Sequence, residues 1–278
     1  MAYVKPSEFA AQMIEAGEAK IFMSTKDTLI RAYMAGAILA LAAAFAVTIA
    51  VNTGNFLVAS LLFPVGFCML YLLGFDLLTG VFTLAPLALL AKRSGVTWGG
   101  VLRNWGLVFI GNFAGAMTTA IFMAIIFTMG FSQEPNAVGQ KIGVIGETRT
   151  VGYAAAGAAG FLTVFIRAVM CNWMVSTGVV AAMMSNTVSG KIMAMWMPIL
   201  VFFYLGFEHS IVNMFLFPSG IMLGGNFGWF EYLAYNEIPV IVGNLVGGLT
   251  FVGGMIYATH FRTSPSRRPV GTVAEPAE

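Results

Sequence analysis

Long apolar stretches separated by short polar ones dominate the chain. A helix that crosses a bilayer needs about 20 mainly apolar residues. Candidate spans lie at about 28–52, 56–91, 100–130, 152–185, 190–222 and 236–261. The second and the fifth are too long for one regular helix, and each contains an acidic residue followed by a proline. The pattern predicts an all-α integral membrane fold with six transmembrane helices, of which the second and fifth are broken by a re-entrant bend.

The two ends of the chain differ from this apolar centre. Residues 5–25 have the pattern of an amphipathic helix, with one apolar face and one acidic face: Phe9, Met13 and Ala16 against Glu8, Glu15 and Glu18. The C-terminal end is short, rich in Pro, Ser and Arg, and has no apolar periodicity. We expect a cytoplasmic interfacial helix within 1–27, a six-span domain over 28–262 and a disordered cytoplasmic tail over 263–278.

Basic residues fall mostly on one side of the expected spans. With the N-terminus inside, only Lys141 and Arg149 of the 14 Lys and Arg residues lie on the outer side, and Arg167 lies within a span. The remainder lie on the inner side. An excess of Lys and Arg marks the cytoplasmic side of a membrane protein. Both termini are therefore expected to be cytoplasmic, and the protein is expected in the inner membrane.

The two halves of the chain are similar at a constant offset of 132 residues. Leu73-Gly74-Phe75-Asp76 corresponds to Leu205-Gly206-Phe207-Glu208, and Gly111-Asn112 corresponds to Gly243-Asn244. Several special residues at one offset indicate an internal repeat. Each copy contains three spans, an odd number, so the two copies are expected to insert as inverted repeats. Function is expected where the broken helices meet, near residues 76–79 and 208–213.

Composition narrows the class of protein further. Of the 278 residues, 59% are hydrophobic and 9% are charged, whereas a soluble domain carries roughly 25% charged residues. This excludes an ordinary soluble fold and makes the lipid bilayer the expected surroundings. A net charge of +2 without a basic stripe gives no reason to expect nucleic acid as a partner. Cys68 and Cys171 lie in apolar runs without metal or redox spacing, so no cofactor is expected.

Few ionisable residues lie away from the ends of the spans: Asp76, Arg167, Glu208 and His209, with His260 near the end of the last span. A charge at the bilayer centre costs roughly 2.5–3.5 kcal/mol on insertion scales, so each requires a partner or a wet cavity. His209 lies at the second break. A neutral imidazole donates one hydrogen bond to a passing anion, and a protonated one can pass its proton on. The alternative is a neutral histidine bonded to a loop carbonyl.

The other polar and aromatic residues near the breaks each have two interpretations. Thr79 occupies the matching break, where its hydroxyl either faces His209 or bonds its own helix. Asp76 and Glu208 are expected to bond freed backbone or to pair with a base. Four amides near the breaks are expected to brace backbone: Asn112, Asn172, Asn213 and Asn244. The last three are also candidates for the substrate path. Phenylalanines near the breaks narrow a pore or simply pack in the core; they are Phe63, Phe67 and Phe202.

Two other classes of protein fit the sequence less well. An enzyme is disfavoured because the chain has only two histidines, no HExxH motif and no Cys/His ligand set. A water or glycerol channel has a similar six-span inverted plan, but such channels usually carry two Asn-Pro-Ala loops, and this chain has none. A neutral-solute channel of the aquaglyceroporin type remains as the alternative class.

The motifs around the breaks resemble the formate/nitrite transporter family from about Lys20 to His260. The run Glu208-His209-Ser210 followed by Asn213-Met214 is highly specific for that family. Further matching motifs are Phe63-Pro64-Val65-Gly66, Phe75-Asp76-Leu77-Leu78-Thr79-Gly80, Asn104-Trp105, Cys171-Asn172-Trp173 and Gly243-Asn244. The resemblance implies an aquaporin-like fold, a homopentamer with one pore in each subunit, and passage of small monovalent anions.

The resemblance also implies roles for single residues. His209 matches the family's central histidine, and Thr79 matches the threonine that hydrogen-bonds it. Lys20 matches a cytoplasmic lysine, and Glu208 the glutamate beside the histidine. Hydrophobic constrictions carry over to Phe63, Phe67, Leu77 and Phe202.

One departure from the family pattern concerns the outer end of the fourth span. The family commonly has a lysine where this chain has Ala156, and Arg149 is our candidate substitute.

Taken together, the motifs and the breaks predict a channel or proton-coupled transporter for formate. Nitrite is the closest competing substrate, and hydrosulfide, acetate or lactate follow.

Overall fold

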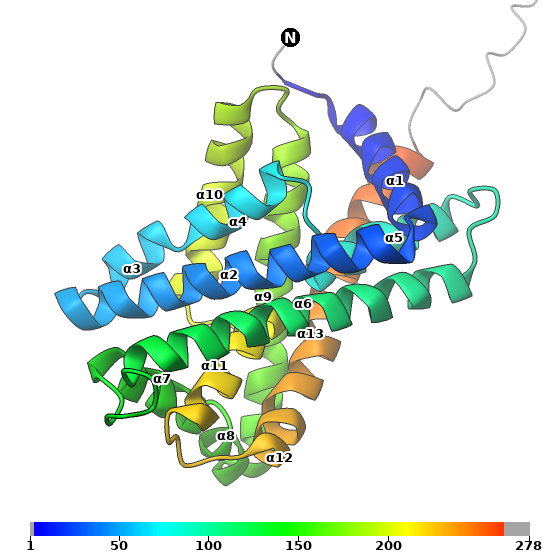
Figure 1. Ribbon diagram of the computed structural model, residues 1–278. Coiled ribbons are helices and arrows are strands. Elements are labelled where there is room, and N and C mark those ends of the chain that lie inside the picture. Colours follow the sequence, from blue (N-terminus) through cyan, green and yellow to red (C-terminus); the bar gives the residue numbers. More distant parts are fainter. Residues whose placement is uncertain (1–2, 264–278) are drawn as a thin grey trace, which may run out of the picture.

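The computed structural model describes residues 3–263, and over that range the fold is helical (Figure 1). Four helical segments are long and apolar enough to cross a membrane: α2 (Thr25–Thr53), α6 (Trp98–Phe127), α9 (Gly157–Met183) and the composite helix Trp229–Arg262. The composite helix runs through α12 (Trp229–Tyr232), η1 (Leu233–Glu237), α13 (Ile238–Gly248), η2 (Leu249–Gly254) and η3 (Tyr257–Arg262), where η denotes π-helical turns. The predicted helical membrane fold is confirmed. The predicted tail lies, from residue 264 onward, outside the described residues.

Two further apolar regions are divided into shorter helices. The first contains α3 (Phe56–Leu62), α4 (Pro64–Leu72) and α5 (Leu78–Leu90). The second contains α10 (Val188–Tyr204) and α11 (Ser210–Met222). The chain is thus interrupted between α4 and α5 and between α10 and α11. These are the two positions at which the sequence predicts breaks.

Both breaks begin with the same backbone turn. Gly74 and Gly206 have φ angles of 72° and 65°, in the left-handed region that glycine adopts without a steric penalty. The amide of Phe75 donates to the carbonyl of Leu70 at 2.9 Å, and the amide of Phe207 donates to that of Phe202 at 3.0 Å. This bonding pattern closes a helix C-terminus after a left-handed glycine. The similar sequences of the two halves therefore produce the same local ending of α4 and α10.

Glycines allow the long helices to pack closely in each half. Figure 1 shows α2 and α6 running side by side. A Cβ on Gly115 of α6 would overlap the backbone carbonyl oxygen of Tyr33 in α2, and a Cβ on Gly247 of α13 would overlap that of Val169 in α9. Gly115 and Gly247 are counterparts in the sequence repeat. The repeat therefore encodes equivalent helix–helix contacts.

Gly115→Ala is expected to destabilise the protein by about 1–3 kcal/mol, because the added methyl group forces α2 and α6 apart. Thermal unfolding in detergent measures the effect. Gly106→Ala on the same helix is the matched control, since a Cβ at Gly106 would meet no atom within 4 Å. Equal unfolding temperatures for the two variants would contradict the packing argument.

The first helix of the chain lies outside the apolar spans. Helix α1 (Pro6–Phe22) packs on α5 through a buried face that includes Phe9, Met13 and Gly17. It also contacts η3, so the first and last helices of the described chain lie at the same end of the bundle (Figure 1). Its position at the cytoplasmic membrane surface stays a prediction.

Helix α7 (Ala137–Thr148) was not expected from the sequence. Asn136 caps its first turn, accepting from the amides of Val138 and Gly139 at 3.1 and 3.0 Å. Val138 and Ile142 are buried, and Ile145 continues the same face. An asparagine cap followed by apolar residues at helical spacing is a helix signal, but the segment is too short to register as a span. This helix, followed by the short α8 (Val151–Ala155), carries Lys141 and leads to Arg149.

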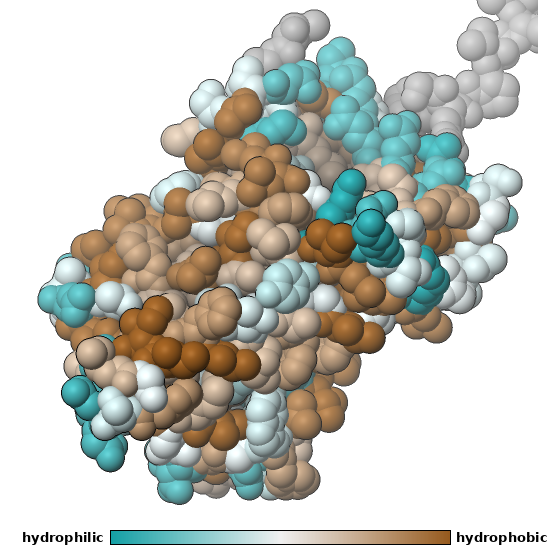
Figure 2. Space-filling view, in the orientation of Figure 1, coloured by the Kyte–Doolittle hydropathy of each residue, from teal (hydrophilic) through white to brown (hydrophobic). Residues whose placement is uncertain are grey.

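The surface separates into polar ends and an apolar middle. Figure 2 shows hydrophilic residues gathered over α1 and near the connection between α5 and α6, with a smaller group at the opposite end near α7. Hydrophobic residues cover the surface between these two groups. Such a band fits the hydrocarbon core of a bilayer.

Candidate functional site

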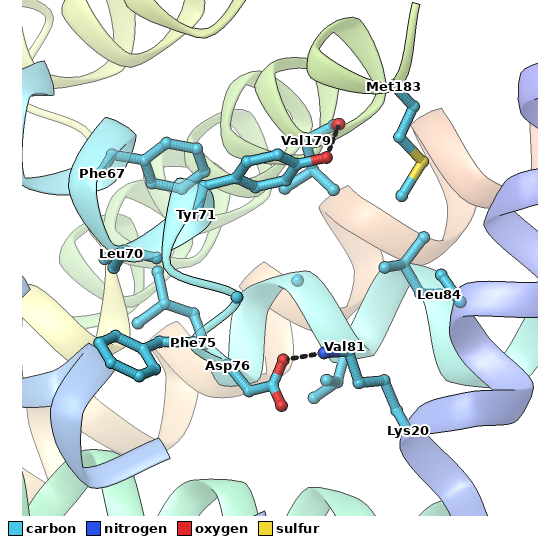
Figure 3. A pocket seen from close by; sticks show the side chains of 14 residues that line it. Lys20, Phe67, Leu70, Tyr71, Phe75, Asp76, Val81, Leu84, Val179 and Met183 are labelled. Atoms are coloured by element: carbon cyan, nitrogen blue, oxygen red, sulfur yellow. Dashed lines mark hydrogen bonds and ion pairs between the residues drawn. The ribbon is translucent and has the colours of Figure 1, made fainter. Parts of the chain in front are cut away.

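Two pockets lie near the two breaks. The α1-side pocket has a volume of about 260 Å³, and its wall includes Leu77. Figure 3 shows Lys20, Phe67 and Asp76 around the same pocket. Lys20 and Asp76 form an ion pair, with side chains 18% and 5% exposed. Asp76 therefore pairs with a base, one of the two alternatives left open by the sequence. The other walls of this pocket are almost entirely apolar.

The α7-side pocket is smaller, at about 80 Å³. It is bordered by Phe202 and His209 from the second break and by Lys141 and Arg149 from the segment around α7. Arg149 Nε lies 3.6 Å from Glu208 Oε1. Each pocket thus contains at least one basic side chain, and the α7-side pocket contains two. Basic groups in clefts with low-dielectric walls raise the local concentration of anions.

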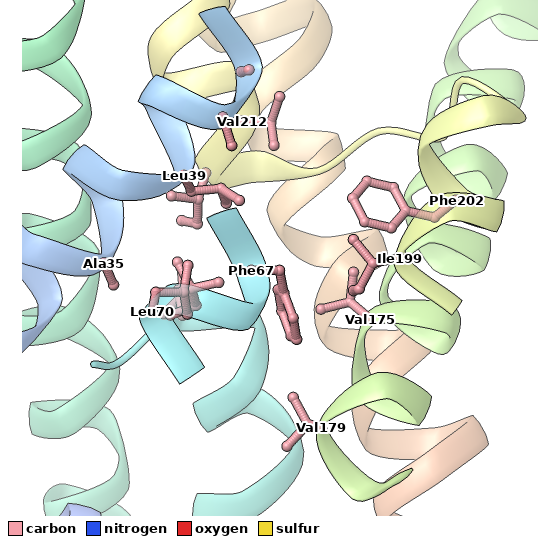
Figure 4. Close-up of a cluster of buried hydrophobic side chains, with 14 of the residues drawn as sticks. Ala35, Leu39, Phe67, Leu70, Val175, Val179, Ile199, Phe202 and Val212 are labelled. Atoms are coloured by element: carbon pink, nitrogen blue, oxygen red, sulfur yellow. The ribbon is translucent and has the colours of Figure 1, made fainter. Parts of the chain in front are cut away.

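Apolar side chains occupy the space between the pockets. Figure 4 shows Phe67 of α4 and Phe202 of α10 directed into one buried cluster, together with Val175 of α9 and Ile199 of α10. Phe67 and Phe202 each border one pocket. Phe63 borders neither pocket and stacks on Phe203 with ring centroids 3.9 Å apart. An ion that passes between the pockets must therefore cross an apolar barrier, which is costly without compensating polar contacts.

Thr79 and His209 meet at the junction of the two breaks. Thr79 lies in the first turn of α5, and His209 immediately precedes α11. Thr79 Oγ1 lies 3.3 Å from His209 Nε2, and both side chains are buried. The expected contact between the two halves is therefore present. Thr79 lies two residues from Leu77 of the α1-side pocket, while His209 borders the α7-side pocket, so the pair links the two walls.

The imidazole of His209 is oriented by the helix that it precedes. Its Nδ1 accepts hydrogen bonds from the amides of Ile211 and Val212 at 3.2 and 3.4 Å, which caps the N-terminus of α11. An Nδ1 that accepts carries no proton, so the neutral ring has its hydrogen on Nε2. The N–H at Nε2 then points to Thr79 and provides a hydrogen-bond donor at the barrier. Protonation of Nδ1 would remove both capping interactions.

Asn112 and Asn244 brace the two breaks in the same way. Asn112 Oδ1 accepts from the amide of Leu78 at 2.9 Å, and its Nδ2 donates to the carbonyls of Ala32 and Asp76 at 2.7 and 2.8 Å. Asn244 Oδ1 accepts from the amide of Ser210 at 3.0 Å, and its Nδ2 donates to the carbonyls of Ala168 and Glu208 at 2.8 and 2.9 Å. At each break one side chain thus satisfies an exposed backbone amide and carbonyl and ties them to a carbonyl of a long neighbouring helix.

Asn172 and Asn213 also make contacts within the protein. Asn172 Nδ2 donates to the carbonyls of Thr79 and Asn244 at 3.1 and 2.7 Å, linking the two halves. Asn213 Nδ2 donates to Glu208 and to Asn236 at 3.0 and 2.7 Å. None of Asn172, Asn213 and Asn244 borders either pocket. These contacts support the bracing interpretation, and a place for the three amides on a substrate path stays a prediction.

Glu208 is the centre of a hydrogen-bonded network. Its carboxylate accepts from Tyr153 at 2.8 Å and from Asn213 and Asn236 at 3.0 and 3.3 Å, and it pairs with Arg149. Arg167 Nη1 donates to the Tyr153 hydroxyl oxygen at 2.9 Å. Arg167, for which the sequence indicated no partner, is therefore connected to Glu208 through Tyr153. These donors and cations compensate the buried negative charge.

Sequence reasoning missed three members of the site. Lys141 was assigned only to the outer side, because the helix that carries it was not recognised. Tyr153 carried no signal in the sequence. Asn236 was detectable, since the repeat pairs it with Asn104, whose amide donates to the carbonyl of Lys20 at 3.0 Å. In the second half Asn236 donates to the carbonyl of Arg149 at 2.9 Å. The two asparagines therefore each fix the backbone of a basic residue at one pocket.

Comparison with known proteins gives one family. The model of the family described as "Formate/nitrite transporter" matches residues 7–258. The "Probable formate transporter" of Methanothermobacter thermautotrophicus is 38% identical over 213 residues, covering 74% of this chain and 76% of that protein. "Formate channel FocA" of Escherichia coli K12 is 29% identical, covering 91% and 94% of the two chains.

Solved structures agree at the level of the fold. A structure described as "Pentameric formate channel with formate bound" matches with a TM-score of 0.69 and 24% identity, covering 84% of this chain and 96% of that one. A structure described as "FNT family ion channel" matches with a TM-score of 0.73 and 22% identity, covering 91% and 98%. The resemblance inferred from the motifs is thus confirmed, as is the expectation of a transport protein rather than an enzyme. The chain belongs to the formate/nitrite transporter family and is an integral membrane protein.

Proposed function

We propose that this protein is a channel for small monovalent anions and that formate is its principal substrate. The observation that supports this most strongly is the arrangement of two pockets with basic side chains on either side of an apolar barrier. At that barrier the Nε2 hydrogen of His209 is the available donor. The names of the formate channels and transporters among its relatives favour formate.

Passage begins in a pocket whose basic groups attract the anion. At the barrier the carboxylate of formate exchanges water for a hydrogen bond from His209 Nε2, with Thr79 as the group that holds the imidazole between passages. Phe67, Leu77 and Phe202 exclude water and larger solutes. Since Nδ1 is occupied by the cap of α11, the imidazole acts first as a neutral donor. Direct passage of the anion is therefore the favoured route, and proton-coupled passage as formic acid is the alternative.

The proposal also includes the architecture that surrounds the pore. The two halves form inverted repeats of three spans each, in an aquaporin-like arrangement, with the breaks of the second and fifth spans facing each other. Five subunits assemble, each with its own pore. In a bacterial cell the protein lies in the inner membrane with both termini cytoplasmic, so the α1-side pocket opens to the cytoplasm and the α7-side pocket opens to the outside.

A substrate panel on one reconstituted preparation tests the proposed selectivity. Formate is expected to give the highest flux into proteoliposomes, followed by nitrite and then by hydrosulfide and acetate, while glycerol does not pass. A glycerol-selective result would favour the neutral-solute class, and a nitrite or hydrosulfide maximum would reassign the substrate. Recording internal pH and current during formate addition distinguishes charge-carrying anion passage from proton-coupled entry.

Removing a basic side chain from the α7-side pocket is expected to slow anion uptake at low ionic strength. Arg149→Ala and Lys141→Ala should each lower the rate by about two- to fivefold, because electrostatic attraction by exposed charges acts over about 10 Å at 0.1 M salt. The difference should shrink at high salt. Lys141→Arg, which keeps the charge, is the control.

For Arg149, this experiment also tests its proposed role as the substitute for the family lysine that Ala156 replaces. Unchanged uptake by Arg149→Ala at low salt would refute that role. Because Arg149 also pairs with Glu208, its variant must be shown to unfold at a temperature close to that of the Lys141 variant.

A further inference from the structure

A second buried carboxyl group lies beside the Glu208 network and has no role in the proposed passage of anions. Glu237 is the last residue of η1 and is 2% exposed. Its Oε2 accepts a hydrogen bond from the hydroxyl of Tyr232 at 3.0 Å. Its Oε1 is buried and has no hydrogen-bond partner among the described residues.

No cationic side chain of the described residues pairs with Glu237. Among residues 3–263, the ion pairs join Lys20 to Asp76, Arg93 to Glu18 and Arg149 to Glu208, and none involves Glu237. An ionised carboxylate buried with one neutral donor and no cation is strongly unfavourable, and such a group binds a proton instead. Glu208 differs, since Arg149 and three hydrogen-bond donors surround its carboxylate.

A neighbouring amide shows the same shortage of donors. Asn236 adjoins Glu237 in sequence, and its Oδ1 accepts from Asn213 Nδ2 at 2.7 Å. The Oδ1 of Asn213 is itself buried without a donor among the described residues. Two buried acceptors in this region, Glu237 Oε1 and Asn213 Oδ1, thus lack a hydrogen. A proton on Glu237 turns one of these two unsatisfied acceptors into a donor.

The titratable groups around Glu237 come from η1 itself, from the elements that pack against it and from the adjoining network. Two cationic side chains of the described residues belong to that network: Arg149 is paired with Glu208, and Arg167 donates to the Tyr153 hydroxyl oxygen. The Glu231 carboxylate accepts from the amide of Gly228 at 2.9 Å, and α13 contributes no titratable side chain. The full set is Tyr153, Glu208, His209, Glu231, Tyr232 and Tyr235, with Arg149 and Arg167 as the cations of the network.

We propose that Glu237 is a proton-binding site that holds a proton in the folded channel and thereby adds no second buried negative charge beside Glu208. The site is connected to the second break, because Glu208 directly precedes His209 and shares Asn213 and Asn236 with the segment that carries Glu237. The inference goes beyond the proposed function, since it does not depend on which solute crosses.

Infrared spectroscopy of the whole protein in nanodiscs at neutral pH tests the site. The wild type is expected to show the carbonyl stretch of an un-ionised carboxylic acid, which moves to lower frequency in D₂O. Glu237→Gln should remove this band, and Glu237→Asp should move it without abolishing it. Glu134→Gln is the matched control, because Glu134 is an exposed carboxyl group and its variant should keep the band. A band that persists unchanged in both Glu237 variants would overturn the proposal.

Thermal unfolding gives a second and independent measurement. A free Glu titrates near about 4.3, so the unfolded chain releases the proton at neutral pH whereas the folded protein keeps it. Raising the pH from mildly acidic to neutral should therefore lower the unfolding temperature of the wild type more than that of Glu237→Gln. Parallel pH profiles for the two proteins would contradict a proton held at Glu237.

Discussion

Formate flux through His209→Phe is expected to fall by about tenfold or more, because the hydrogen-bond donor at the barrier disappears and an unmatched buried polar group costs about 1–3 kcal/mol. Any pH dependence that belongs to the imidazole should disappear with the flux. Stopped-flow measurement of formate entry into proteoliposomes gives the rate, and light scattering in detergent reports the assembly, which should remain intact. Flux equal to that of the wild type at every pH would remove His209 from the mechanism.

A second variant separates the two functions of this side chain. His209 also caps α11, and Phe removes that cap together with the donor. His209→Asn keeps a short side-chain oxygen that can accept from the first amides of the helix, but it is too short to replace Nε2 opposite Thr79. If the donor matters, His209→Asn loses flux while its unfolding temperature stays near that of the wild type. Restored flux in this variant would assign the effect of Phe to the lost cap.

The second large effect is expected at the two bracing asparagines. Asn244→Ala removes three hydrogen bonds, to the amide of Ser210 and to the carbonyls of Ala168 and Glu208. The combined loss should be at least about 3 kcal/mol, which corresponds to about 6–12 °C in unfolding temperature for a chain of this size. Asn112→Ala removes the equivalent bonds at the first break and should have a similar effect. Thermal unfolding of both variants gives the comparison.

The control for these variants is Asn52→Ala, since Asn52 is exposed on α2. It should leave the unfolding temperature within a few degrees of the wild type. A mild effect of Asn244→Ala, equal to that of Asn52→Ala, would show that water or backbone movement satisfies the freed groups. The loss of flux should accompany the loss of stability only for the two bracing residues, because they hold the segments that carry Thr79 and His209.

Local rules were sufficient for much of the site. The breaks follow from Gly74 and Gly206, whose left-handed conformation ends α4 and α10. The constant offset between the halves identified Asn112 and Asn244 as equivalent residues. Long-range contacts were not accessible in this way. Tyr153 is the shared partner of Arg167 and Glu208, and the separation along the chain between Tyr153 and Glu208 carries no periodic signal. Helix α7 was missed because a short surface helix buries only one narrow apolar face.

The sequence by itself determined the membrane class, the two breaks and the family, because these depend on apolar length, on glycine and proline positions and on specific motifs. The tertiary structure decided which of the possible polar contacts form. It paired Lys20 with Asp76 and Arg149 with Glu208, and it turned Nδ1 of His209 toward its own helix, so that Nε2 faces Thr79. The physical reason is that burial makes every unpaired polar atom costly, and only the packed arrangement of helices determines which partner is within reach.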